Sequence, residues 1–333
     1  MAQTSKLNFD RQFAAAVASA GEFGASLEQL PAGDVDGRRK GFEKLFAAIS
    51  SMIPVIPGIT KTEHELQAAD GKTIVLTEFR PSKTPPAPSP AVYHVHGGGM
   101  ILGSVTSMGQ TIAARAATAG VPLFSIEYRL APEYPHPTPI NDCYDGLVWL
   151  HSNAEKLGID NSRIMIVGES AGGGLAAGTA LKARDSKLSP PLAYQMLIYP
   201  MLDDRNLTAN PDVEPLAMWK TDDNKTGWGA LLGKAAGSDQ EVEGHEYAAP
   251  ARAKDLTNLP PTFIDVGQLD IFAPEDIKYA SRLIEAGVPT EFHLYPGLPH
   301  AFWSFFPNLQ VSKTAAWNTT AGFEWLLNED GSR

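Results

Sequence analysis

The sequence predicts an α/β fold in which helices flank both faces of a mostly parallel central sheet. From residue 73 onward, short apolar runs alternate with helix-forming segments, which is the pattern of repeated strand–helix–strand units. One apolar run, residues 164–169, passes through the pentapeptide Gly-Glu-Ser-Ala-Gly at 168–172 directly into an Ala-rich helical segment. Such sheets bind ligands beyond the carboxyl ends of their strands, so functional residues are expected at those ends.

Strands are predicted where apolar residues run together or alternate, and helices where longer segments carry helix formers or an apolar stripe. The predicted strands are residues 73–80, 91–96, 122–128, 164–169, 193–199, 262–266 and 290–295. The predicted helices are residues 111–120, 141–156, 175–184, 274–286 and 313–328. The proline-rich residues 81–90 are expected to form a stiff loop between two strands.

We expect one main domain, residues 71–333, preceded by a helical and irregular N-terminal segment, residues 1–70. An apolar stripe at helical spacing in this segment favours a helix packed on the same molecule, and a membrane-surface anchor is the alternative. The stripe consists of Phe42, Leu45, Phe46 and Ile49. Residues 203–247 interrupt the alternation of strands and helices, so we expect a cap inserted there.

Composition and charge narrow the classes of function. The chain has 333 residues, of which 43% are hydrophobic and 20% charged, as in an ordinary globular protein. Its 27 basic and 38 acidic residues give a net charge of −11, which argues against a nucleic-acid partner. The single cysteine, Cys143, fits a reducing compartment and is expected to pack inside a helix. No segment is long and apolar enough to span a bilayer.

The N-terminus resembles a secretory signal peptide only weakly. Lys6 and Arg11 flank the start of an apolar run at residues 13–20, but this run is short, lacks Leu and follows Asp10. These features favour an ordinary amphipathic helix over a signal peptide. We therefore expect a cytoplasmic protein with no stable membrane insertion.

A nucleophile elbow is predicted at residues 168–172. In a Gly-x-Ser-x-Gly turn between a strand and a helix, the serine adopts a strained backbone conformation, and side chains two positions away would keep strand and helix apart. Gly168 and Gly172 meet this requirement, and Ser170 stands at a helix N-terminus, where the helix dipole favours developing negative charge. The alternative is a Gly/Ser-rich helix start or a phosphate-binding loop.

A serine nucleophile needs a base, and the base needs a third group to orient it. Asp270 and His300 each follow a predicted strand, so both are expected at the same edge of the sheet as Ser170. The order of the three along the chain, Ser then Asp then His, is one of the known orders of a serine triad. Asp265 is the rival acid but lies inside its strand, and the acidic pair at 275–276 resembles charges at a helix start.

Backbone donors for an oxyanion are predicted after the strand 91–96. His96 is followed by three glycines, 97–99, which expose their N–H groups and let an acyl group approach closely. The N–H groups expected to form the oxyanion hole are those of Gly98, Gly99 and Ala171. His96 is expected to shape this loop, whereas His94 is expected to be a core residue.

Taken in order, these motifs resemble those of the hormone-sensitive-lipase-type branch of the α/β-hydrolase esterases. The matching segments are residues 96–99, 128–133, 168–173, 199–200, 270 and 299–302. The resemblance covers about residues 70–328 and implies a serine carboxylesterase that hydrolyses short- to medium-chain acyl or aryl esters through an acyl-enzyme on Ser170. It also implies the same oxyanion donors and a cap built from the N-terminal segment and the insert after the sixth core strand. Members of this branch often pair through their last strand and helix, so a homodimer is an open expectation. Glu169 stands where relatives often carry Asp or Thr.

Apolar residues near the motifs and in the cap predict a hydrophobic slot for the substrate, with core filling as the alternative. They are Met100, Leu102, Trp219, Trp228, Phe302, Trp303 and Phe305. The histidines show no metal-ligand spacing and the first strand carries no nucleotide-binding Gly motif, so no metal or cofactor is expected.

Three other functions are compatible with the same fold. The same triad would serve a lactone, aryl-amide or formamide hydrolase, because attack and oxyanion stabilisation do not differ. A ligand-binding protein on an inactive hydrolase scaffold would usually lack a member of the triad, and here all three residues are present. A lipase acting at a membrane surface would rest on the apolar stripe in the N-terminal segment.

Overall fold

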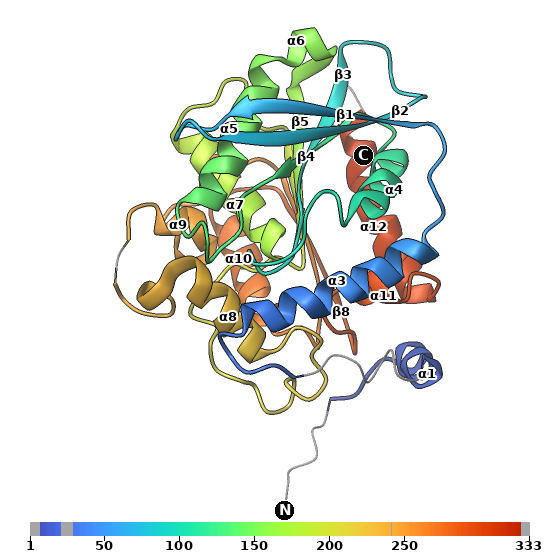
Figure 1. Cartoon of the computed structure of the whole chain (residues 1–333), viewed down its shortest axis with the longest axis vertical. Helices are drawn as coiled ribbons and strands as arrows, with labels where there is room; N and C mark the ends of the chain where they lie inside the picture. The colour runs from blue at the N-terminus through green and yellow to red at the C-terminus, as the bar shows by residue number, and fades with distance from the viewer. Residues whose placement is uncertain (1–6, 21–28, 241, 328–333) are drawn as a thin grey trace, which may run out of the picture.

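The computed structural model describes residues 7–20, 29–240 and 242–327. Parts of the two expected regions, 1–70 and 71–333, therefore lie outside the described residues, as do Lys6 and the predicted end of the last helix at residue 328. The described chain forms one eight-stranded sheet with the strand order β1-β2-β4-β3-β5-β6-β7-β8 (Figure 1). β2 pairs antiparallel with both of its neighbours, and every other pairing from β4 to β8 is parallel, as the sequence predicts.

The strands lie close to their predicted positions, apart from one additional strand. They are β1 (Ile59–Gln67), β2 (Thr73–Pro81), β3 (Ser89–Val95), β4 (Leu123–Glu127), β5 (Ile159–Glu169), β6 (Tyr194–Ile198), β7 (Thr262–Gly267) and β8 (Thr290–Tyr295). The helices are α1 (Arg11–Ser19), α3 (Val35–Met52), α4 (Gly109–Ala119), α5 (Thr138–Ser152), α6 (Ala154–Leu157), α7 (Ala171–Asp185), α8 (Thr221–Leu232), α9 (His245–Ala248), α10 (Ala273–Glu285), α11 (Phe302–Phe305) and α12 (Gln310–Leu327), with short 3₁₀ turns at Gly233–Ala235 and Pro250–Arg252.

The central strands are apolar throughout because both faces of the sheet are covered. On β5, Ile164 and Ile166 pack into the core under α5, α7 and α10, whereas Met165 and Val167 pack into the core under α4 and α12. Successive side chains of a strand point to opposite faces, so a strand buried on both sides shows a continuous apolar run. Cys143 is fully buried on α5, as expected.

The expectation that residues 1–70 are helical and irregular is wrong for β1. This strand is at the edge of the sheet, and Leu66 is its one buried residue within a run of Thr, Lys, Glu and His side chains. Charged residues on an edge strand discourage pairing with other chains, but they also remove the apolar pattern that would reveal a strand.

The two regions expected to form a cap contain α3 and α8, and α8 lies near the start of α3 (Figure 1). Arg38 of α3 is buried and its Nε donates to Asp223 of α8 at 2.8 Å. The Nε of Arg39 donates to the carbonyl of Ile101 at 2.9 Å, and its guanidinium forms two 2.7 Å hydrogen bonds with Glu133. As predicted, the apolar stripe of α3 packs on the molecule itself: Phe42 contacts the main core.

The first described helix, α1, packs against the segment that leads to His300. Phe13 is buried with Tyr295 and Phe302 in a small apolar cluster. Just before this helix, the N–H of Asp10 donates to the carbonyl of Gly297 at 2.7 Å. The helix therefore covers the chain on either side of His300.

A buried ion pair fixes the chain after β4 against α5. Asp142 is fully buried and accepts hydrogen bonds from the Nε and Nη2 of Arg129 at 2.8 and 2.6 Å and from the backbone N–H of Arg129 at 2.9 Å. The second guanidinium edge pairs with Asp70 at 2.7 Å. Arg129 therefore links α5, through Asp142, to the turn between β1 and β2, through Asp70.

We predict that Arg129→Met lowers the free energy of unfolding by about 3–5 kcal/mol, because it leaves the Asp142 carboxylate buried without its cation. Chemical denaturation measures the change. The control is Lys61→Met, which removes the exposed pair with Glu63 and is expected to cost less than about 1 kcal/mol. Equal, small losses in both variants would contradict the assignment.

Candidate active site

The turn between β5 and α7 has the geometry of a nucleophile elbow. Ser170 adopts φ 57° and ψ −124°, and its N–H donates to the carbonyl of Ile198 at 2.9 Å. A Cβ at position 168 would lie 2.1 Å from the carbonyl oxygen of Gly172, and a Cβ at position 172 would lie 2.2 Å from that of Val95. Only glycine fits at these two positions, as the sequence predicts.

The structure brings Ser170, His300 and Asp270 together. The Nε2 of His300 lies 3.0 Å from the Oγ of Ser170, and its Nδ1 lies 2.5 Å from the Oδ2 of Asp270. The other carboxylate oxygen of Asp270 accepts the N–H of Phe272 at 3.0 Å. Ser170 and His300 each keep 8% of their surface exposed, and Asp270 keeps 1%. The hydrogen bonds orient the imidazole so that it can take a proton from the serine.

The other carboxyl groups at this edge have different environments. Both side-chain oxygens of Asp265 lack a hydrogen-bond partner in the part of the chain that the structure describes, and burial raises the pKa of this group to about 7. Glu275 is not a solvated charge at a helix start: it is buried and accepts the N–H groups of Leu202 and Asp203, at the beginning of the cap insert. Asp276 is fully buried, and burial raises its pKa well above the ordinary value.

The glycine loop after β3 forms a tight turn beside the nucleophile. Gly98 has φ 123°, and a Cβ there would lie 2.1 Å from the carbonyl oxygen of Leu102. A Cβ on Gly97 would lie 3.4 Å from the Cβ of Ser170, so the loop runs against the elbow. Within the described residues, the N–H groups of Gly98, Gly99 and Ala171 have no hydrogen-bond acceptor. They are therefore available to a developing oxyanion.

His96 supports this loop from inside. Its Nδ1 lies 2.9 Å from the carbonyl oxygen of Gly97, and its ring stacks on Tyr128 with centroids 4.3 Å apart. The hydroxyl of Tyr128 donates to the carbonyl of His96 at 2.9 Å. Burial lowers the pKa of His96 to about 4, so the ring is neutral near pH 7 and its Nδ1–H donates to the carbonyl.

Two aromatic rings that the sequence does not single out as site residues hold the imidazole of His300. Tyr199 approaches it edge-on with centroids 4.6 Å apart, and Phe272 does so at 5.2 Å. Tyr199 belongs to a motif noted in the sequence, but nothing in that motif indicates contact with a histidine 101 positions later. Phe272 follows Asp270 closely, and this proximity is the only signal that could have revealed it.

The predicted pocket residues separate into two groups. Met100, Leu102 and Trp228 are buried in the main core, and Phe302 is buried under α1, which favours core filling for these four. Trp219, Trp303 and Phe305 are half-buried. The ring of Trp219 lies against the glycine loop, because a Cβ on Gly99 would lie 2.5 Å from its Cη2.

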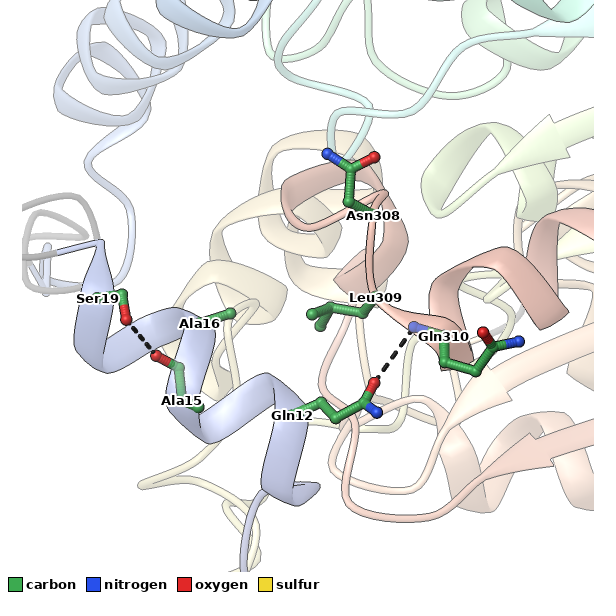
Figure 2. Close-up of a pocket in the computed structure, with 7 residues that line it drawn as sticks. All are labelled: Gln12, Ala15, Ala16, Ser19, Asn308, Leu309 and Gln310. Carbon is green, nitrogen blue, oxygen red and sulfur yellow. Dashed lines mark hydrogen bonds between the residues drawn. The ribbon is translucent and has the colours of Figure 1, made fainter.

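A separate surface cavity of about 550 Å³ lies between α1 and the start of α12 (Figure 2). It is lined by Gln12, Ala15, Ala16, Ser19, Asn308, Leu309 and Gln310. None of these is a predicted site residue. Within residues 7–20, 29–240 and 242–327, no group of three or more His, Cys, Asp or Glu side chains is placed to hold a metal ion. No helix in the same ranges has the length and apolar character needed to cross a bilayer.

We predict that Asp265→Asn gains stability relative to the wild type as the pH rises from about 4 to about 7. Folded Asp265 titrates at about 7 and an unfolded Asp at about 4, so over this range the folded wild type binds the extra proton and loses stability with rising pH. The variant lacks this dependence. Urea unfolding at pH 4.5, 6 and 8 measures it; parallel pH profiles for the two proteins would contradict a raised pKa.

Comparison with known proteins agrees with this geometry. A family model described as alpha/beta hydrolase fold matches residues 92–304. Esterase LipI of Mycobacterium tuberculosis is 32% identical over 256 residues, which cover 75% of this chain and 77% of LipI. Ethyl acetate hydrolase of Pseudomonas putida is 30% identical over 299 residues, which cover 85% of this chain and 87% of the relative.

Solved structures show the same similarity in three dimensions. A bacterial heroin esterase superimposes with a TM-score of 0.85 at 35% identity, covering 97% of this chain and 99% of the other. A hyperthermophilic esterase from Pyrobaculum calidifontis superimposes with a TM-score of 0.80 at 31% identity, covering 95% and 98%. With its glycine loop, its elbow and its sheet order, the chain belongs to the α/β-hydrolase fold family, in the hormone-sensitive-lipase-type branch.

Proposed function

We propose that this protein is a serine carboxylesterase that hydrolyses short- to medium-chain acyl or aryl esters. The observation that carries the proposal is the hydrogen-bonded series from Ser170 through His300 to Asp270, facing backbone N–H groups that have no acceptor among the described residues. Relatives whose names denote an esterase, an arylesterase and an ethyl acetate hydrolase support small ester substrates.

The proposed reaction transfers the acyl group twice. Ser170 Oγ attacks the ester carbonyl while His300 Nε2 accepts the hydroxyl proton, and Asp270 keeps the imidazole in the tautomer with Nδ1 protonated. The N–H groups of Gly98, Gly99 and Ala171 stabilise the oxyanion. His300 then protonates the leaving alcohol. A water molecule attacks the acyl-enzyme in the same way and releases the acid and free Ser170.

We propose that α3 and the insert at 203–247 form a cap over this site. Arg39 of α3 binds the carbonyl of Ile101, two residues beyond the glycine loop, and Trp219 of the insert covers Gly99. Both contacts support a cap beside the proposed oxyanion donors. Among the predicted pocket residues, we assign Trp219 and Trp303 to the substrate slot.

The competing functions differ in how well these contacts support them. A lactone, aryl-amide or formamide substrate would use the same groups and remains the second candidate, because the triad geometry serves it equally. A ligand-binding role without catalysis gains no support, since all three residues are present with their hydrogen bonds. A membrane-surface lipase gains none from α3, because Phe42 of its stripe contacts the main core and Ile49 is buried.

We further propose that the enzyme acts in the cytoplasm as a homodimer without a nucleic-acid partner. The single buried cysteine supports a cytoplasmic location. The net charge of −11 supports the absence of a nucleic-acid partner. The edge strand β8, with Leu294 40% exposed, supports pairing through the last strand.

We predict that p-nitrophenyl esters from acetate to palmitate give a maximal rate at short to medium chain length, and that Ser170→Ala lowers kcat by roughly 10⁴-fold or more on the best of them. Initial rates of both proteins measure this. Thermal unfolding controls for folding of the variant, and labelling by a fluorophosphonate reports the nucleophile directly. Labelling without ester turnover, together with turnover of a lactone or formanilide, would favour the second candidate.

We predict that Trp219→Ala raises kcat/KM for octanoate relative to acetate by about tenfold, because it removes the ring beside Gly99 and widens the slot. The ratio of the two p-nitrophenyl esters measures the change. Trp317→Ala is the matched control, since Trp317 is 67% exposed on α12. An unchanged ratio in Trp219→Ala would remove Trp219 from the substrate slot.

A further inference from the structure

The residue before the nucleophile belongs to a buried charged cluster that the proposed reaction does not use. The Oε2 of Glu169 lies 2.9 Å from the Nε2 of His94 on β3, and its Oε1 pairs with the Nη2 of Arg115 on α4. His94 in turn contacts the Oγ of Ser125 through Nδ1 at 2.9 Å. His94 is thus satisfied, as expected of a core residue, but it is satisfied by a carboxylate of the elbow.

Arg115 also reaches the other catalytic segment. Its guanidinium carbon lies 5.8 Å from the ring centroid of Trp303, three residues beyond His300. The Trp303 ring lies 6.0 Å from that of Tyr199, which contacts the His300 ring at 4.6 Å. The Arg115 guanidinium therefore contacts both Glu169, which precedes Ser170, and α11, which follows His300.

The burial of this cation indicates a role beyond filling space. Arg115 keeps 8% of its surface exposed, although arginine is rarely buried without a specific partner. A buried ion pair often contributes no more stability than apolar residues of the same volume. It nevertheless fixes the relative position of its two side chains, because separating them leaves buried charges unpaired at a large cost in free energy. Planar guanidinium can pair with a carboxylate and lie on an aromatic ring at the same time, which lysine cannot do as well.

We propose that Arg115 is a positioning residue that couples the Ser170 elbow to the His300 segment by pairing with Glu169 and packing on Trp303. The proposal rests on the serine esterase mechanism above and adds a residue that sets the geometry of its first proton transfer. Productive attack needs the Ser170 hydroxyl and the His300 imidazole to be correctly aligned, and a misplacement of these groups by about 1 Å costs about 10²-fold in rate.

The charges around Glu169 allow the role to be tested. The titratable or charged groups that face it are His94 from β3, Arg115 from α4, Tyr199 from the end of β6, His96 from the loop after β3, and Tyr128 from the segment after β4. Burial alone would raise the pKa of Glu169, but Arg115 and His94 outweigh it and lower the pKa to about 2. At neutral pH the pair with Arg115 is therefore an ion pair.

The test compares three variants with wild type: Arg115→Met, Arg115→Lys and Arg115→Met/Glu169→Gln. Active sites are counted with a fluorophosphonate, and kcat and KM for p-nitrophenyl butyrate are given per counted site across pH 5–9. Arg115→Met is expected to lose about 10- to 100-fold in kcat with a change in KM below about threefold. The acidic limb of its kcat/KM profile is expected to move to higher pH, because the uncompensated charge of Glu169 favours the protonated imidazole of His300.

The other two variants separate charge from geometry. Arg115→Lys keeps the charge, so its pH profile is expected to match wild type. Its kcat is expected to fall, because lysine lacks the planar guanidinium group that pairs with Glu169 and packs on the ring of Trp303. The double variant removes both charges, so its pH profile also returns to wild type while kcat stays low. A double variant with wild-type kcat would overturn the coupling.

Arg129→Met is the matched control, because it removes another guanidinium that pairs with a carboxylate and contacts neither the elbow nor α11. It is expected to lower thermal stability and leave kcat per counted site unchanged. If Arg115→Met does the same, Arg115 has only a structural role and the proposal is wrong. Should Arg115→Met fail to fold, wild-type kcat in Arg115→Lys overturns the proposal. Failure of the esterase mechanism is distinct, since wild type itself would then show neither labelling nor turnover.

Discussion

The backbone conformation of Ser170 is the constraint on which the site depends. A non-glycine residue with positive φ costs about 1–3 kcal/mol and persists only where its surroundings fix it. Here the N–H of Ser170 is held by Ile198, and its carbonyl accepts the N–H of Met201 at 2.9 Å. Because the turn is so tight, Gly172 lies against the carbonyls that end β3, so the glycine loop that follows β3 cannot lie anywhere but beside the nucleophile. The proposed nucleophile and the proposed oxyanion donors are thus brought together by one turn.

Along the same edge, two neighbouring carboxyl groups have pKa values that are shifted in opposite directions. In the sheet register, Glu169 pairs with Ile198 and Ile198 with Asp265, so the two acids stand in one row with a single strand between them. Glu169 has a cation and an imidazole and is ionised, whereas Asp265 has no side-chain partner among the described residues and its pKa is raised by burial to about 7. Neighbouring positions in the sheet therefore do not give the two carboxyl groups the same pKa; burial and the presence or absence of a cationic partner set it.

What the sequence could predict is set by how local each signal is. The parallel strands are visible because burial on both faces leaves a continuous apolar run, while β1 is invisible because an edge strand carries charge. Ser170, Asp270 and His300 can be found because each lies in the turn or loop that follows a strand. Arg115 cannot, because its partners Glu169 and Trp303 lie far along the chain and α4 looks like any helix. The pocket is the least predictable part: an aromatic near a motif has the same sequence signal whether it lines a slot, as we propose for Trp219, or fills the core, as Trp228 does.

The packing of α1 on the segment around His300 ties the beginning of the described chain to a part made near its end. During synthesis, Phe13 emerges long before Tyr295 and Phe302, its partners in the apolar cluster. The helix therefore lacks these partners until residues 295–302 have left the ribosome, and the imidazole of His300 can join Ser170 only at the same stage. Assembly of the proposed catalytic apparatus and burial of α1 consequently both require the segment around His300, so hydrolytic competence would report that this segment has folded.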